Sequence, residues 1–314
     1  MNFLIIFSFV LLGFFAKKFS LTSSLLAHRV SQYVIYICLP AIVLLKLPKL
    51  QLTTDLLFPT LMAWIIILFA WFMVRLAAKR FRWSREIEGC LLLIVCFGNT
   101  SFVGFPIIQA FYGEQALVYA VVYDQLGSFL SLAIIGNLIL AKYAPNEHAA
   151  MDTEVDGYLE NKPSVLGIFR KILEFPPLIA ILLSFILRAY PLYTSVDEIL
   201  FVISKTLVPT TMFLVGHHLV FKLPQHKRNP LIFGIGLKML VLPLVALTLL
   251  LVFQQQGMHA RVTLMETAMP PMVTATILAI HAKLAPKLAA AAVGYGLLVA
   301  AGSLPLIYWV SKSF

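Results

Sequence analysis

The sequence predicts an all-α integral membrane protein with ten transmembrane helices, and two properties carry this prediction. First, 61% of the 314 residues are hydrophobic and only 12% are charged, whereas an ordinary soluble domain is about half apolar and about a quarter charged. Second, the apolar residues come in runs of about twenty, which is the length that crosses the hydrocarbon core of a bilayer. The chain is therefore expected to be a multi-pass membrane protein.

The ten candidate spans divide into two sets of five. One long polar and acidic connection, residues 142–171, separates the sets and is expected to be a cytoplasmic linker between residues 1–141 and residues 172–314. The spans run roughly over residues 2–16, 30–47, 56–76, 87–108, 115–141, 174–190, 197–218, 229–253, 260–281 and 287–311.

The distribution of basic residues predicts the orientation of the spans. The connections after spans one, three, seven and nine hold more lysine and arginine than the other short connections, and basic loops stay in the cytoplasm. Both termini are therefore expected outside.

The first apolar run has no basic residue before it and is followed by Lys17 and Lys18, which is the reverse of a signal peptide, so we expect a retained helix. Because five is an odd number, two similar sets must have opposite orientations.

Helix-breaking residues occupy matching places in the two sets. Pro40 lies within the second span and Pro209 within the seventh. About sixty residues after each proline, the fourth span of the set is interrupted, at residues 98–106 and at residues 270–271. Irregular backbone is tolerated at membrane depth only where it is buried in protein or lines a wet cavity. Inverted repeats with interrupted helices in matching positions are typical of a transporter whose site lies between them.

The first interruption supplies polar groups. Asn99, Thr100 and Ser101 offer side-chain donors and acceptors, while Gly104 and Pro106 keep the backbone from closing into a regular helix. A single Gly/Pro kink would be an ordinary feature of a membrane helix. A polar cluster with a partner interruption in the other set favours a binding site, in which helix N-termini offer partial positive charge to an anion.

Four ionisable residues lie inside the predicted spans: Asp124, Lys205, Lys238 and Glu266. An unpaired charge at mid-bilayer costs about 2.5–3.5 kcal/mol, so all four are expected to face the protein interior or a cavity. The two lysines are candidates to attract a carboxylate, and the two acids are candidates for ion coupling. Internal pairing of the four is the alternative. Gln125 follows Asp124 directly and is expected to point elsewhere on the helix.

Other classes of function find little support in the sequence. The formal net charge is +10, but the basic residues cluster in loops and form no stripe with aromatic residues, so nucleic-acid binding is not expected. No HExxH, GxSxG or Walker pattern is present, so we expect neither an enzyme nor a cofactor. The three cysteines and the adjacent His217 and His218 lack metal-ligand spacing.

The segments GNTSFVGFPII and AFYGEQAL, within residues 98–117, resemble the fourth-span signature of the auxin efflux carrier family. The bacterial members of that family include malate and malonate permeases, and the resemblance extends over essentially the whole chain. It implies a secondary active transporter of a small organic anion, a carboxylate such as malate or malonate, working by alternating access. It also implies the inner membrane of a bacterium, a proton or sodium ion as coupling ion, and a homodimer.

The resemblance further implies a fold similar to that of bile-acid/sodium symporters, in which the broken fourth and ninth helices cross. Spans one, two, six and seven would form a scaffold panel, and spans three to five and eight to ten a mobile transport domain. The second interruption has no asparagine to match Asn99, which leaves sodium coupling open. A sodium symporter of the bile-acid class and a membrane sensor are the alternative functions. With the two lysines, the candidate substrate-binding residues are Asn99, Thr100, Ser101, Gly104, Pro106, Pro40, Pro209, Thr210, Pro270, Pro271, Lys205 and Lys238.

Overall fold

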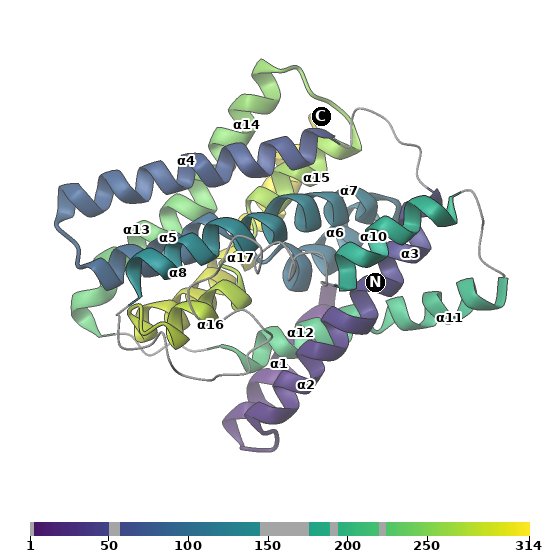
Figure 1. The fold of residues 1–314 in the computed structure, drawn as a ribbon, viewed down its shortest axis with the longest axis horizontal. Coiled ribbons are helices and arrows are strands. Elements are labelled where there is room, and N and C mark those ends of the chain that lie inside the picture. Colours follow the sequence, from purple (N-terminus) through teal and green to yellow (C-terminus); the bar gives the residue numbers. More distant parts are fainter. Residues whose placement is uncertain (1–2, 50–56, 145–175, 189–193, 220–223) are drawn as a thin grey trace.

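The protein is described here from a computed structural model, which covers residues 3–49, 57–144, 176–188, 194–219 and 224–314 (Figure 1). These residues form helices and no strand, so the predicted all-α class is confirmed for the described part of the chain. Most of the expected linker, residues 142–171, lies outside the described residues.

The first half of the chain forms a series of helices, some of them interrupted by wider or tighter helical turns. They are α1 (Phe3–Lys18), α2 (Ser24–Tyr33), η1 (Val34–Cys38), α3 (Leu39–Lys46), η2 (Leu47–Lys49), α4 (Leu57–Phe81), α5 (Arg85–Cys96), η4 (Thr100–Gly104), α6 (Phe105–Tyr112), η5 (Glu114–Ala116), α7 (Leu117–Val122), η6 (Tyr123–Phe129), η7 (Leu132–Gly136) and α8 (Asn137–Tyr143).

The second half has a similar order of elements. They are α10 (Pro176–Leu187), α11 (Thr194–Lys205), α12 (Leu207–His217), η9 (Gln225–Lys227), α13 (Arg228–Gly236), η10 (Leu237–Val241), α14 (Leu242–Val252), α15 (Met258–Thr267), α16 (Val273–His281) and α17 (Pro286–Ser311).

Six continuous helical segments in the described residues are long and apolar enough to cross a membrane. These six are Leu25–Lys46, Leu57–Phe81, Glu114–Tyr143, Ser195–His217, Arg228–Val252 and Pro286–Ser311. The other predicted spans correspond to the shorter helices α1 and α10 and to two interrupted helices, α5 with α6 and α15 with α16.

Wide π-helical turns lie directly before three prolines. η1 precedes Pro40, η4 precedes Pro106 and η10 precedes Pro243. A proline has no N–H group and its ring clashes with the carbonyl four residues earlier, and in each case that carbonyl belongs to the π turn. Widening the helix there accommodates the ring, and such turns often mark functional sites.

Two long helix pairs join the halves of the chain. α1 packs along α12, and α10 packs along α3; in Figure 1, α1, α2 and α12 lie at one end of the molecule, away from α4 and α14. The α1–α12 crossing needs glycine on both helices, because small residues allow backbones to approach closely. A Cβ on Gly13 would lie 2.9 Å from the carbonyl carbon of Phe213, and one on Gly216 would lie 2.8 Å from that of Val10.

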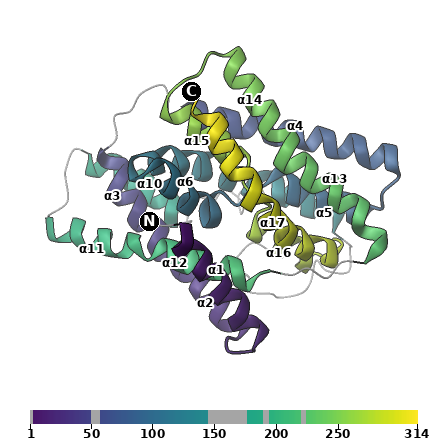
Figure 2. The same ribbon diagram turned by 180° about the vertical axis from the view of Figure 1, so that it is seen from behind.

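The two interrupted helices occupy the centre of the bundle. Residues 89–96 of α5 and residues 262–267 of α15 are buried on every side, and α17 runs along α15 and α16 (Figure 2). The interruptions meet as a short antiparallel bridge between Gly98 and Pro271. Two backbone hydrogen bonds close it: Asn99 N donates to Pro270 O at 2.8 Å, and Met272 N donates to Phe97 O at 3.0 Å. Each interrupted segment therefore pairs, in the other segment, backbone N–H and C=O groups that would otherwise have no hydrogen-bond partner.

Candidate functional site

The meeting point of the two interrupted helices is the candidate site, and Asp124 lies beside it. The Asp124 carboxyl group is 1% exposed and accepts three hydrogen bonds. The hydroxyl groups of Thr100 and Ser101 both donate to Oδ1, the latter at 2.6 Å. The amide of Gln125 donates to Oδ2 at 2.6 Å. Asp124 thus ties η6 to the polar segment of the first interruption, and both of its oxygens have partners.

The contact between Asp124 and Gln125 corrects the expectation that Gln125 points elsewhere. Adjacent residues on a regular α-helix do not face each other, but both residues lie in the π-helical segment η6. The wider turn changes the direction of successive side chains. The amide group of Gln125 therefore reaches the carboxyl group of its neighbour.

Glu266 lies on the other side of the first interruption. Its side chain is fully buried, and in the described part of the structure neither carboxyl oxygen has a hydrogen-bond partner. The carboxyl group lies directly against Gly104. A Cβ placed on Gly104 would be 2.8 Å from Oε1 and 2.9 Å from Cδ of Glu266, and closer still to Oε2. Glycine at position 104 is what makes room for this carboxyl group.

Lys238 brings a buried cation to the same place. Its side chain is 3% exposed, and its Nζ would lie 3.0 Å from a Cβ built on Gly98. Among the ion pairs of the described residues, none includes Lys238. The carboxyl group of Glu266 interacts with this charge but forms no ion pair with it within the described residues, so the buried ammonium group marks a position that favours a closer anion.

Three further buried polar atoms around the crossing have no partner among the described residues: Asn99 Nδ2, Gln125 Oε1 and Thr263 Oγ1. The oxygen of the Asn99 side chain is already used, because it accepts from the N–H of Phe102 at 3.2 Å. Its amide hydrogens remain available to a ligand. Native structures leave few buried polar groups unpaired, and each one asks for an explanation.

The structure brings most of the predicted site residues together. Gly104, Pro106, Pro270 and Pro271 are buried at or beside the crossing with the polar residues described above. Pro40 is half-buried at the start of α3.

The helix α12 carries two more of the predicted residues. Pro209 and Thr210 are half-buried on α12, which packs against η4 and α6. The hydroxyl of Thr210 donates to Thr206 O at 2.6 Å and is thus held by its own helix.

Lys205 is the exception, and the expectation that it faces the interior is wrong. It ends α11 with an exposed side chain, and its Nζ lies 4.1 Å from the ring centroid of Phe201. A long lysine side chain near a helix end can keep its charge in a polar environment while its stem covers apolar surface. Lys205 is therefore separate from the buried crossing.

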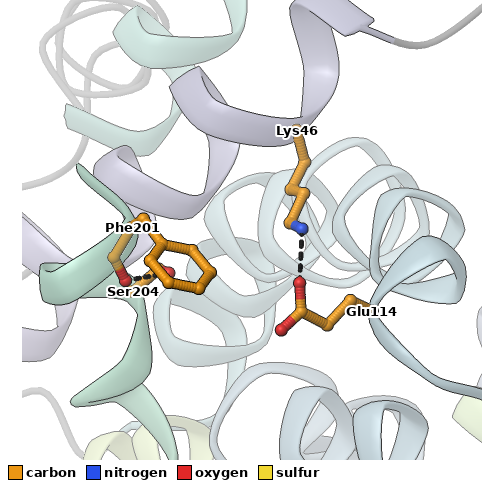
Figure 3. A network of polar contacts seen from close by, with 4 residues as sticks. All are labelled: Lys46, Glu114, Phe201 and Ser204. Carbon is orange, nitrogen blue, oxygen red and sulfur yellow. Dashed lines mark hydrogen bonds and ion pairs between the residues drawn. The ribbon is translucent and has the colours of Figure 1, made fainter. Parts of the chain in front are cut away.

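An ion pair that the sequence analysis did not single out joins α3 to the start of the fifth span. Lys46 Nζ lies 2.7 Å from Glu114 Oε2 (Figure 3), and the two side chains are half-buried to exposed. The nearby Ser204 hydroxyl only donates to the Phe201 carbonyl of its own helix, at 2.8 Å. The pair connects two elements on opposite sides of the predicted scaffold boundary, and no local pattern in the sequence indicates it.

A membrane bundle whose buried centre consists of two interrupted helices and unpaired polar groups is the architecture of a membrane transporter. Comparison with known families agrees. The family model for membrane transport proteins, the auxin efflux carrier family, matches residues 1–308, and the chain belongs to this family.

Two relatives extend over nearly the whole chain. One is an uncharacterized transporter of Methanothermobacter thermautotrophicus, 26% identical over 300 residues, which are 95% of this chain and 93% of the relative. The other is an uncharacterized transporter of Methanocaldococcus jannaschii, 26% identical over 303 residues, which are 92% of this chain and 91% of the relative. The chain is thus an integral, multi-pass membrane protein of a transporter family.

Proposed function

We propose that the chain is a secondary active transporter of a small organic anion, a mono- or dicarboxylate such as malate or malonate. The single observation that carries the proposal is the buried ammonium group of Lys238, which lies against Gly98 at the crossing without an ion-pair partner among the described residues. The unpaired amide of Asn99 provides a second donor at the same crossing. A carboxylate accepts hydrogen bonds from both kinds of group.

The proposed fold consists of ten spans in two inverted repeats of five. Helix packing supports it, because equivalent elements pair across the halves. Span one packs on span seven as α1 on α12, and span six packs on span two as α10 on α3. Likewise α4 packs on α5, and α14 packs on α15. An inverted repeat requires such reciprocal pairs.

In this scheme the scaffold consists of spans one, two, six and seven, and the transport domain of spans three to five and eight to ten. The crossing belongs to the transport domain, and α12 of the scaffold packs against η4 and α6 beside it. Substrate held at Asn99, Thr100, Ser101 and Lys238 would then be carried as the transport domain moves against the scaffold. The proposed setting is the inner membrane of a bacterium, with both termini outside and a homodimer formed through the scaffold.

Ion coupling is assigned to the two buried acids, Asp124 and Glu266, with a proton or sodium as the ion. A sodium-coupled symporter of the bile-acid class is the alternative, and sodium dependence of uptake separates the two. A membrane sensor on the same fold is the less favoured alternative, and it would bind the acid without moving it.

Uptake into proteoliposomes tests the proposal. Labelled malate, malonate, lactate and indole acetate are offered under a proton gradient and, separately, under a sodium gradient. We expect saturable uptake of at least one acid by the wild type, loss of uptake in Lys238→Gln, and wild-type uptake in the control Lys287→Gln, whose side chain is exposed at the start of α17. Binding without uptake would favour a sensor. If the folded protein neither binds nor takes up any of these acids, the proposal is overturned.

A further inference from the structure

We propose that the coupling ion is a proton and that Glu266 carries it, while Asp124 is a fixed structural partner of the first interruption. This inference rests on the proposed transport function. Its starting point is a difference between two buried acids at one crossing. Asp124 has hydrogen-bond partners for both oxygens, whereas in the described structure Glu266 has a partner for neither.

The difference decides which acid is free to change its protonation state. Protonating Asp124 would turn one acceptor oxygen into a donor, although its three partners all donate to it, so at least one of these hydrogen bonds would have to rearrange. Protonating or deprotonating Glu266 breaks no hydrogen bond of the described residues. Acidic residues inside a membrane bundle serve as proton relays in transporters, and the unpaired one is suited to this role.

The surroundings of Glu266 favour a proton over a metal cation. Hard cations such as Ca²⁺ and Mg²⁺ take about six or more oxygen ligands, and sodium likewise prefers oxygen. In the described residues no three His, Cys, Asp or Glu side chains gather to hold a metal. The Asp124 oxygens already accept three hydrogen bonds, and Lys238 places a positive charge at the crossing that would repel a second cation. A proton needs one oxygen.

The same geometry links the proton to the substrate. An ionised Glu266 would repel a carboxylate that binds beside Lys238, and a protonated Glu266 would not. Binding of the proton therefore favours binding of the anion, and by thermodynamic reciprocity binding of the anion favours the proton. Anion and proton would then cross together, with the carboxyl group of Glu266 binding the proton on one side and releasing it on the other.

The charges of two groups at the crossing act on Glu266, namely Asp124 on η6 and Lys238 on η10. The hydroxyl of Tyr123 is hydrogen-bonded to the hydroxyl of Thr267 at 3.2 Å. The helices α7 and α14, which also pack on α15, hold no acidic or basic residue. The remaining charged residues of α15 and of the elements packed on it lie toward helix ends: Arg75, Lys79, Arg80, Glu114, His259, Arg261 and Lys287.

The test separates exchange from accumulation, using wild type, Glu266→Gln and the control Glu86→Gln, whose side chain is exposed at the start of α5. Glutamine resembles a permanently protonated glutamate. We expect Glu266→Gln to exchange labelled for unlabelled acid across the membrane as the wild type does. A gradient of one pH unit should drive about tenfold accumulation by the wild type, none by Glu266→Gln, and wild-type accumulation by Glu86→Gln.

Each outcome decides between the inference and the function on which it rests. Accumulation by Glu266→Gln under the pH gradient, or accumulation by the wild type under a sodium gradient alone, overturns the inference and leaves the transporter intact. If the wild type neither exchanges nor takes up any of the four acids, the proposed function itself is overturned.

A second variant covers a failure of Glu266→Gln to fold. Glu266→Asp keeps a proton-binding carboxyl group but moves it away from Gly104, so it should still accumulate acid with a shifted pH dependence. A dye trapped inside the vesicles reports whether protons enter with the acid. An unchanged pH profile in Glu266→Asp, or acid entry by the wild type without proton entry, contradicts the inference.

Discussion

Substitution of Gly104 by alanine tests the contact on which the site geometry depends. The added Cβ would lie 2.8 Å from Oε1 and 2.9 Å from Cδ of Glu266, and closer to Oε2, which is shorter than ordinary contact distance. Because Glu266 is fully buried between packed helices, its carboxyl group has little room to move. Overpacking of this kind costs about 1–3 kcal/mol. At about 2–4 °C per kcal/mol for a chain of 150–250 residues, the melting temperature should fall by several degrees.

The assay is thermal unfolding of purified protein in detergent, with Gly236→Ala as the matched control. A Cβ on Gly236 meets no atom within 4 Å, so that variant shows the effect of alanine in a helix without the clash, a gain of at most about 1 kcal/mol. The double variant Gly104→Ala with Glu266→Ala should recover most of the loss caused by Gly104→Ala, because the clashing group is gone. A Gly104→Ala protein as stable as Gly236→Ala, or strictly additive effects in the double variant, would refute the contact.

Three further predictions concern stability, two measured by the same unfolding assay and one by size-exclusion chromatography. Ser101→Ala removes one of the hydrogen bonds that Asp124 accepts and should cost about 1–3 kcal/mol; a loss of the same size in a variant that already carries Asp124→Ala would show that the bond is not the cause. Gly216→Leu places a side chain into the backbone of α1 and should prevent stable folding, seen as aggregation in size-exclusion chromatography, and a monodisperse protein would contradict the close crossing. Lys46→Gln breaks the partly exposed pair with Glu114 and should cost only about 0.2–1 kcal/mol, so a fall of many degrees would show that the pair does more than its exposure suggests.

The sequence was sufficient for the membrane class and for the places where helices break. Hydropathy over about twenty residues is a local property, and so is the loss of a backbone donor at Pro106 or Pro270. The prediction of interruptions near residues 98–106 and 270–271 therefore needed no knowledge of packing, and in the structure the regular α-helix stops at Cys96 and at Thr267. The polar residues Thr100 and Ser101 were likewise visible as candidates.

Partners across elements were beyond local reasoning. Lys205 and Lys238 looked equivalent in the sequence, since both are lone lysines within apolar spans. The structure exposes Lys205 beside Phe201 and buries Lys238 against Gly98. The difference follows from which helix is central and which is peripheral, and this depends on how all helices pack.

What the sequence by itself determined is a helical membrane protein with two polar, proline-marked interruptions and four ionisable residues among its spans. What only the tertiary structure decided is that Asp124 is fully bonded, that Glu266 lies unpaired on Gly104, and that Lys238 reaches the crossing from η10. Composition and helix breaking arise from neighbours along the chain. The placement of buried polar groups brings together residues from different helices, some of them, such as Glu266 and Gly104, more than a hundred positions apart, and their distances are set by helix rotation and close glycine contacts rather than by any local pattern.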